Sequence, residues 1–237
     1  MKKCILAMLG AGAVITSPAK ASDARIVTGS EEAASAEVDQ AFALIGQKQP
    51  AQALDLLAPL IDRFNQQIAE AEKTRMVFCG PTLMEASVYA VLPAIEKKDG
   101  LVMGRDVCDA FFAKAYALVE LDRKPEALAT LQRLTSLAPM HSRYLVELGY
   151  AYRINGQNGK AEDAYRMALE HADLGEDDKT KSTNHASALR GIGYMLVEKR
   201  DLAAAENAYK KSLKYDPDSA IAKGELEFIA QQRKRAK

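Results

Sequence analysis

The chain has 237 residues, of which 48% are hydrophobic and 27% are charged. This composition excludes a wholly disordered chain and allows one globular body or one array of repeats with a sizeable core. Tryptophan is absent, aromatic residues make up only 6% and alanine is frequent, which favours closely packed helices over an aromatic-rich β-sandwich. The basic and acidic side chains balance at 32 each, so nucleic acid is a poor candidate for a partner.

The first 21 residues have the features of a signal peptide. Two lysines precede an apolar run at 4–16, and the sequence A-K-A at 19–21 has small residues at the two positions that a signal peptidase reads. The run is shorter than the roughly 20 residues of a membrane span, and no second such run follows. We predict cleavage before Ser22 and a soluble periplasmic or secreted protein without a stable membrane span. Cleavage removes three lysines and no acid, so 29 basic side chains remain against 32 acidic ones and the formal charge becomes −3.

The segment 66–106 fits no repeat. We interpret it as an extension of the preceding helix, a break at 79–81, a helix from Thr82 to Glu96 and a loop over 97–106. This interpretation predicts a helical insertion in an otherwise repetitive chain.

After this segment, one spacing pattern occurs three times. In each copy a small residue is followed three positions later by a large one, and an alanine, a second large residue and a helix stop come after them. The second copy begins 34 residues after the first, and the third is displaced by 44 because 171–185 inserts about ten residues. The positions that define the pattern include Ala115, Ala127, Gly149, Tyr152, Ala161, Tyr165, Gly193, Ala205, Tyr209 and Pro217.

The pattern is physically that of a helical hairpin. Gly149 and Ala161 are small, so that two antiparallel helices can approach closely, while Tyr152 and Tyr165 fill the space on either side. Neither helix could bury its apolar face alone. This pattern resembles the tetratricopeptide repeat, and a weaker copy begins near Glu37.

The resemblance implies an all-α solenoid of antiparallel helix pairs that binds a protein or peptide, needs no cofactor and is not an enzyme. From the predicted signal peptide to its last helix the chain is similar to secreted bacterial tetratricopeptide repeat proteins, which implies no particular pathway. The predicted organisation is a signal peptide at 1–21, a flexible N-terminus at 22–33, a degenerate repeat at 34–65, the helical insertion at 66–106, repeats at 107–140, 141–184 and 185–218, and a capping helix with a basic tail at 219–237.

Two cysteines, Cys79 and Cys108, remain after cleavage. A disulfide would persist in an oxidising compartment, and it requires the two Cα atoms to lie within about 7 Å. A helix over 82–96 that runs away from Cys79 puts Cys108 near its far end, about 22 Å away, which favours two buried free thiols. If the loop at 97–106 doubles back, the two cysteines can meet, so both arrangements stay open.

The sequence contains no zinc-protease motif, P-loop, dinucleotide fingerprint or nucleophile elbow. An acidic cluster with His171 and His185 lies in the third repeat's insertion, and its ligand spacing favours a solvated loop over a metal site.

The repeat register also defines the inner face of the first helices. The residue directly after the small one is aromatic in every copy, and arginines lie nearby, a combination that suits a peptide ligand. We predict that Tyr152 lies in the seam between paired helices and that Tyr150 lies on the inner face. The predicted partner-binding residues are Phe42, Phe112, Tyr116, Arg143, Glu147, Tyr150, Arg153, Arg190, Tyr194 and Glu198.

Packing of these tyrosines against the next repeat is the competing interpretation. The predicted function is an exported scaffold or adaptor for a protein or peptide partner, in the assembly of an envelope complex. A sensor or accessory enzyme subunit that binds a small molecule or a metal is the alternative.

Overall fold

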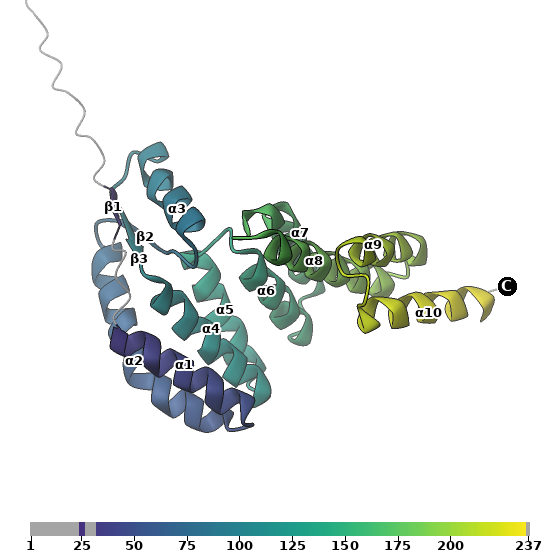
Figure 1. Cartoon of the computed structure of the whole chain (residues 1–237), viewed down its shortest axis with the longest axis horizontal. Helices are drawn as coiled ribbons and strands as arrows, with labels where there is room; N and C mark the ends of the chain where they lie inside the picture. Colours follow the sequence, from purple (N-terminus) through teal and green to yellow (C-terminus); the bar gives the residue numbers. More distant parts are fainter. Residues whose placement is uncertain (1–23, 27–31, 236–237) are drawn as a thin grey trace, which may run out of the picture.

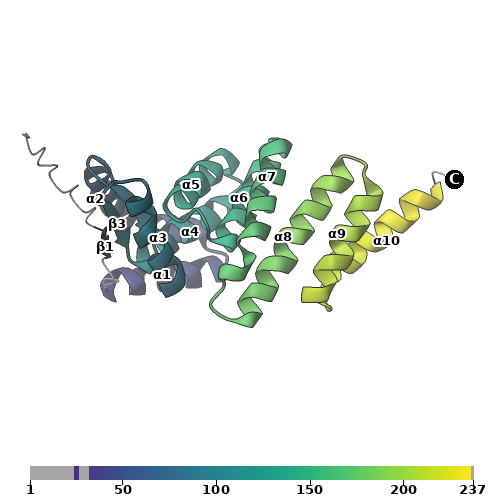
Figure 2. The same cartoon turned by 90° about the horizontal axis from the view of Figure 1, so that it is seen from above.

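The computed structural model describes residues 24–26 and 32–235, which form an elongated, curved array of helices (Figures 1 and 2). Over these residues the α-solenoid predicted from the repeats is confirmed. The signal peptide predicted at 1–21 lies outside the described residues, as does most of the N-terminus at 22–33. Residues Ala24–Ile26 form the strand β1, so the prediction of a flexible N-terminus is wrong at these positions.

In the described part of the chain, four antiparallel helix pairs follow one another and a last helix covers the end of the array. Three residues connect the two helices of each pair. A longer segment that contains the 3-10 turn Ala172–Leu174 precedes the fourth pair. The pairs are α1 (Glu32–Gly46) with α2 (Pro50–Glu72), α4 (Arg105–Glu120) with α5 (Lys124–Leu137), α6 (Ser142–Ile154) with α7 (Asn158–Glu170), and α8 (Asp178–Glu198) with α9 (Leu202–Tyr215), and the last helix is α10 (Ala220–Arg235).

The turn within each pair has the same backbone geometry. Its middle residue has a positive φ, and the two amides that follow the helix donate to carbonyls of its last turn, as Gly156 does to Arg153 at 2.9 Å. The middle residues are Lys48 (φ 62°), Asp122 (φ 55°), Gly156 (φ 74°) and Arg200 (φ 62°). Their spacing repeats the 34 and 44 residues found in the sequence, so the repeat register is also a property of the backbone.

The seams between helices match a small residue to a tyrosine ring. A Cβ atom added to Gly149 would lie 2.7 Å from the ring of Tyr165, and one added to Gly193 would lie 2.9 Å from the ring of Tyr209. Tyr165 also contacts Gly191 of the next first helix, where an added Cβ would be only 2.3 Å from the ring. The two glycines on α8 and the one on α6 therefore allow each tyrosine to fill the space between neighbouring helices.

The insertion is not wholly helical, which corrects the prediction for 66–106. The strand β2 (Met76–Cys79), the helix α3 (Leu83–Ile95) and the strand β3 (Gly100–Met103) form a β-α-β unit. The three strands are parallel, in the order β1-β3-β2, with Ala24 and Met76 both opposite Gly100. The strands have only three or four residues each, and short apolar runs of this kind do not distinguish a strand from a loop or a buried turn.

A disulfide joins Cys79 to Cys108, with the two Cα atoms 5.8 Å apart. The arrangement with two free thiols does not occur, because the segment over 97–106 does not stay at the far end of α3. Strand β3 runs parallel to β2 and carries the chain back along α3, so that Met103 lies opposite Cys79. Helix α4 begins directly afterwards, and its first turn places Cys108 beside the end of β2.

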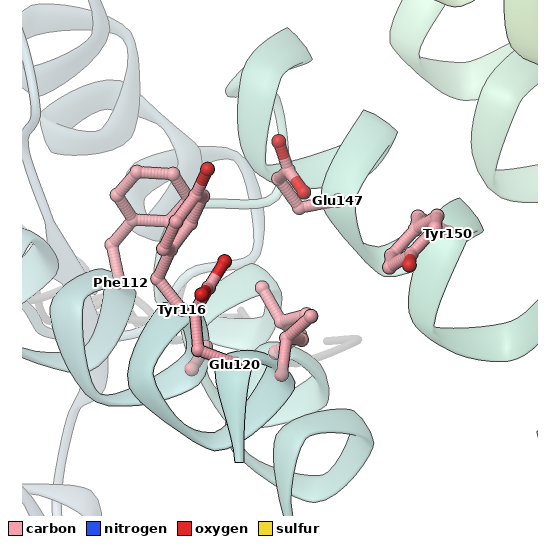
Figure 3. Close-up of a pocket in the computed structure, with 8 residues that line it drawn as sticks. Phe112, Tyr116, Glu120, Glu147 and Tyr150 are labelled. Carbon is pink, nitrogen blue, oxygen red and sulfur yellow. The ribbon is translucent and has the colours of Figure 1, made fainter. Parts of the chain in front are cut away.

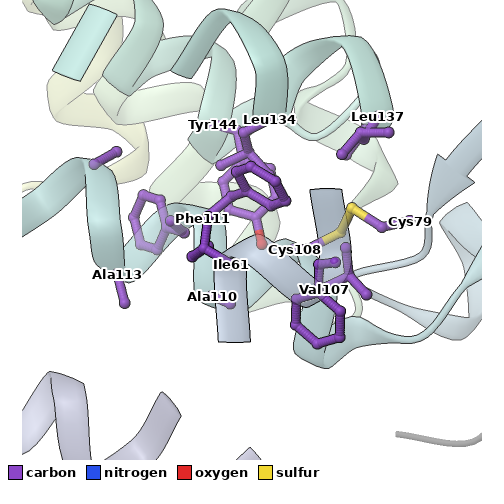
Figure 4. Packing of buried hydrophobic residues seen from close by; sticks show 14 of the residues in the cluster. Ile61, Cys79, Val107, Cys108, Ala110, Phe111, Ala113, Leu134, Leu137 and Tyr144 are labelled. Carbon is purple, nitrogen blue, oxygen red and sulfur yellow. A yellow bond between two sulfur atoms is a disulfide. The ribbon is translucent and has the colours of Figure 1, made fainter. Parts of the chain in front are cut away.

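The largest hydrophobic core lies where the β-α-β unit meets the first helix pairs (Figure 4). Ile61 of α2, Phe111 of α4 and Leu134 of α5 are buried there together with the disulfide. Smaller clusters continue along the array, around Tyr165 and then around Tyr209. No helix within residues 32–235 is both long and apolar enough to cross a membrane.

Candidate partner-binding groove

The first helices of the four pairs line one groove with a volume of about 950 Å³. The start of α3 and the segment between α7 and α8 complete its walls. Each of the four first helices contributes side chains to the groove. One face of the array therefore presents α1, α4, α6 and α8 to a ligand. Of the predicted partner-binding residues, this groove contains Phe42, Phe112, Arg143 and Glu147.

A smaller pocket of about 250 Å³ lies between α4 and α6. Figure 3 shows Phe112, Tyr116 and Glu120 on one helix, with Glu147 and Tyr150 on the next. The pocket combines apolar ring faces with two carboxylates. Glu147 lines both this pocket and the larger groove, so the two spaces form a continuous surface.

Phe112 joins the aromatic side chains at one end of this surface. Its ring centroid lies 6.2 Å from that of Phe42, 6.3 Å from that of Tyr116 and 5.1 Å from that of Tyr144, and the guanidinium carbon of Arg143 lies 4.9 Å from it. Only 5% of Phe112 is exposed, whereas 42% of Tyr116 is. Phe112 is therefore mainly a packing residue, and Tyr116 has an exposed ring surface that a ligand can contact.

Arg153 lies between two tyrosine rings. Its guanidinium carbon is 4.9 Å from the ring centroid of Tyr150 and 4.4 Å from that of Tyr194, so α6 and α8 both hold it by cation–π contact. Burial raises the pKa of Tyr165 to about 12, and the positive charge of the nearby Arg153 acts in the opposite direction. Arg153 takes part in no ion pair among the described residues, because no carboxylate there comes within ion-pair distance.

Glu147 is a half-buried carboxylate in the middle of the groove. Burial raises its pKa above the ordinary value, and the charge of Arg143, one helical turn earlier, partly offsets this effect. A half-buried carboxylate of this kind carries a desolvation cost that a cationic group of a ligand can reduce.

The two tyrosines of α6 lie where the register predicts. Tyr152 packs, partly buried, against two neighbouring core clusters, and its hydroxyl accepts a hydrogen bond from Nε2 of Gln132 at 3.1 Å. Tyr150 lines the smaller pocket and is half-buried. The structure thus places one ring in the seam and the other on the inner face.

Four of the predicted partner-binding residues line neither the groove nor the smaller pocket: Arg153 and Tyr194, which contact each other beside Tyr150, and Arg190 and Glu198. Arg190 donates from Nη1 to Asp216 at 2.9 Å and from Nη2 to Ser187 at 3.0 Å, so it ties α8 to the turn before α10. Glu198 is exposed at the end of α8 and lines neither pocket.

The sequence interpretation missed a polar cluster at the other end of the groove. Glu85 of α3 is only 1% exposed, and its two carboxylate oxygens lie 2.9 and 3.0 Å from Nδ1 of His141. Thr82 caps α3 by accepting from the Glu85 amide and donates to the Glu85 carboxylate at 3.0 Å. The Thr-x-x-Glu spacing indicates this cap, but nothing in the sequence indicates that His141, from another unit, lies against it.

A metal centre has no support in the described part of the chain, where no group of three or more His, Cys, Asp or Glu side chains is arranged to hold an ion. Nε2 of His185, which lies on α8, is 2.8 Å from Asp173 of the preceding 3-10 turn, and the His185 ring stacks on Tyr215 of α9 with ring centroids 4.5 Å apart. The contact with Asp173 attaches the acidic segment to α8, and the ring stack joins α8 to α9.

Two family profiles match the chain, and both are described as tetratricopeptide repeat. One covers residues 112–178 and the other covers residues 186–219. No curated protein matches the chain.

Several solved structures are similar to this chain. The tetratricopeptide repeat domain of Sgt2 from Aspergillus fumigatus is 22% identical, with a TM-score of 0.47, over 54% of this chain and 80% of that domain. The first such domain of Spaghetti (RPAP3), bound to the HSP90 peptide SRMEEVD, is 18% identical, with a TM-score of 0.45, over 53% of this chain and 91% of that one. MamA from Desulfovibrio magneticus RS-1 is 20% identical, with a TM-score of 0.38, over 81% of this chain and 99% of that one.

Proposed function

This chain belongs to the tetratricopeptide repeat family, and we propose that it is a non-enzymatic scaffold that binds an extended segment of another protein along its groove. The four first helices offer a continuous surface for such a segment, with aromatic rings, arginines and one half-buried carboxylate. Repeat arrays of this kind bind through extended surfaces and not through one enclosed cavity.

The observation that carries this proposal is the position of Arg153. Its guanidinium is fixed between Tyr150 and Tyr194 and has no acidic partner among the described residues. A guanidinium held in this way has already lost much of its side-chain freedom, and it keeps donors for a carboxylate. We infer that the bound segment places an acidic group at Arg153.

The pocket beside Arg153 specifies a second feature of the segment. Tyr150 belongs both to the cation–π pair and to the wall of the smaller pocket, together with Tyr116 and Val119. A large apolar side chain next to the acidic group would fill this pocket. Glu147 favours a hydrogen-bond donor or a basic group further along the bound segment. The proposed motif is therefore an acidic residue adjacent to a large apolar one.

We propose that the protein acts in the bacterial periplasm, in the assembly of an envelope complex. The signal-peptide pattern of residues 1–21 supports export. The disulfide between Cys79 and Cys108 supports an oxidising compartment, because such bonds are rare in reducing cytosol.

A phage-displayed library of random peptides, selected on the protein, tests the groove directly. We expect the selected peptides to share an acidic residue beside a large apolar one. Arg153→Gln should weaken them by roughly 10- to 100-fold, because a charge-assisted hydrogen bond contributes about 1.5–3 kcal/mol. Tyr150→Ala should weaken them by a comparable factor, since a central aromatic anchor contributes about 2 kcal/mol or more. Fluorescence anisotropy with labelled peptides measures both.

The matched control is Lys211→Gln, which removes an exposed positive charge from α9, outside the groove. It should leave the affinity unchanged. Selected peptides that bind Arg153→Gln as tightly as the wild type would contradict the proposed site. In cells, a photo-cross-linking residue at position 150 should then capture one envelope protein whose sequence carries the selected motif.

A further inference from the structure

Helix α3 presents an apolar face to solvent on the outside of the β-α-β unit. Leu83 is 81% exposed, Val91 is 56% exposed and Ile95 is 69% exposed. Met84 is also exposed, and Ser87 and Ala94 complete the face. The only charged residue within α3 is Glu85, which is buried, so this face carries no charge.

The opposite side of α3 is firmly attached to the protein. Pro93 packs on the sheet, where a Cβ atom added to Gly100 would lie 2.3 Å from its ring. The buried Tyr89 stacks on Phe78 of β2, with ring centroids 5.3 Å apart, and its hydroxyl accepts from the amide of Met140 at 3.1 Å. The exposed face is thus held in place, and it is not a loosely packed helix that could turn its apolar side inward.

The size of this face is small for a protein partner. A helix of 13 residues is about 20 Å long and 10 Å wide, so it offers roughly 200 Å². A stable protein interface needs about 800 Å² from each partner. An apolar face of this size is better suited to contact with a lipid bilayer than to an interface with a second copy of the chain.

Charged residues lie at one end of this apolar face. Lys97 and Lys98 follow the end of α3 and are exposed, and Arg75 is exposed beside them, next to the pairing of Met76 with Gly100. Two acidic residues, Glu96 and Asp99, lie in the same turn, so basic side chains outnumber acidic ones by one at this end. Basic groups at the edge of an apolar helix are typical of helices that lie on anionic lipid.

From these observations we propose that the exposed face of α3 docks on the surface of an anionic lipid bilayer. Leu83, Val91 and Ile95 enter the boundary between headgroups and acyl chains, and Lys97 and Lys98 contact the headgroups. The contact is peripheral and reversible, because one short helix has a small apolar face. It would hold the groove close to the membrane while leaving it open.

Vesicle flotation with the exported, processed protein tests this proposal. The probes are vesicles of phosphatidylethanolamine with phosphatidylglycerol, and neutral vesicles of phosphatidylcholine. We expect the wild type to float with the anionic vesicles, and the double variant Val91→Gln, Ile95→Gln to float at least about tenfold less, because two exposed apolar side chains no longer enter the bilayer. Lys97→Gln with Lys98→Gln should reduce binding to the anionic vesicles only.

The matched control removes comparable apolar area at the other end of the array. Ile221 and Phe228 of α10 are also exposed, and replacing both by Gln should leave flotation unchanged. Flotation that is absent in the wild type, or equally reduced by the α10 variant, overturns the proposal. Self-association that the Val91→Gln, Ile95→Gln variant abolishes without lipid would overturn it as well, in favour of a second copy.

Discussion

The replacement Gly191→Ala tests the packing of the array at its tightest contact. The ring of Tyr165 lies between Gly149 of α6 and Gly191 of α8. A Cβ atom on Gly191 would lie 2.3 Å from Cδ1, 2.5 Å from Cε1 and 2.6 Å from Cγ of that ring, where an ordinary contact begins near 3.4 Å. The ring would have to move by more than about 1 Å. Gly149 limits movement in its direction, since its own Cβ position is 2.7 Å from the same ring.

Two effects of opposite sign decide the magnitude. Alanine in place of glycine within a helix stabilises by about 1 kcal/mol. Overpacking of a well-filled core costs about 1–3 kcal/mol. We therefore expect Gly191→Ala to lower the free energy of unfolding by up to about 2 kcal/mol. Gly224 of α10 is the matched control, because no atom lies within 4 Å of its Cβ position. Gly224→Ala should raise the free energy of unfolding by about 1 kcal/mol.

Urea unfolding followed by circular dichroism measures both variants. The dependence of the free energy of unfolding on urea concentration must be compared as well as the midpoint, because repeat arrays can unfold in more than one step. The difference between the two variants equals the packing cost and should be about 1–3 kcal/mol. If Gly191→Ala is as stabilising as Gly224→Ala, the proposed role of glycine in seating Tyr165 is refuted.

Three further predictions concern the disulfide, the groove and the two tyrosines of α6. Cys108→Ser should lower the free energy of unfolding by about 3–4 kcal/mol, because the disulfide closes a loop with a sequence separation of 29. Thiol titration of the denatured, unreduced and processed wild type should find no free thiol at Cys79 or Cys108. Two reactive thiols would contradict the bond. Burial raises the pKa of Glu147, so the contribution of this side chain to stability is present at low pH and is lost as pH rises through the folded pKa. Glu147→Gln should therefore raise the melting temperature at pH 7 more than at pH 4. An equal change at both pH values would show that burial of Glu147 does not affect stability. Tyr152→Ala should lower the free energy of unfolding by about 2 kcal/mol while Tyr150→Ala leaves it nearly unchanged, and equal losses in thermal melts would show that both are core residues.

The sheet and the disulfide show where local patterns stop being informative. The four residues of β2 and of β3 are apolar runs that a helix end or a buried loop also allows. Their pairing depends on α3 crossing between them, which is a relation between distant parts of the chain. The distance from Cys79 to Cys108 follows from that crossing and could not be obtained from helix length alone.

The repeat register predicted which side chains of a first helix face inward, but it did not predict the groove that they form. The register correctly separates Tyr150 from Tyr152, because residues two apart on a helix point to nearly opposite sides. The register does not show that Arg153 is held by Tyr194 of the next repeat or that Arg190 is engaged by Asp216. These contacts depend on how far each pair is rotated against its neighbour.

By itself the sequence determined the repeat and its small-to-large seam. These features are local, because a period of 34 residues and a glycine opposite a tyrosine depend on spacing within one hairpin. Only the tertiary structure decided that β1 joins β3, that Cys79 meets Cys108, that Glu85 lies against His141 and that α3 leaves an apolar face uncovered. Each of these joins parts of the chain that no helical period relates, and their positions follow from the packing of whole units against one another.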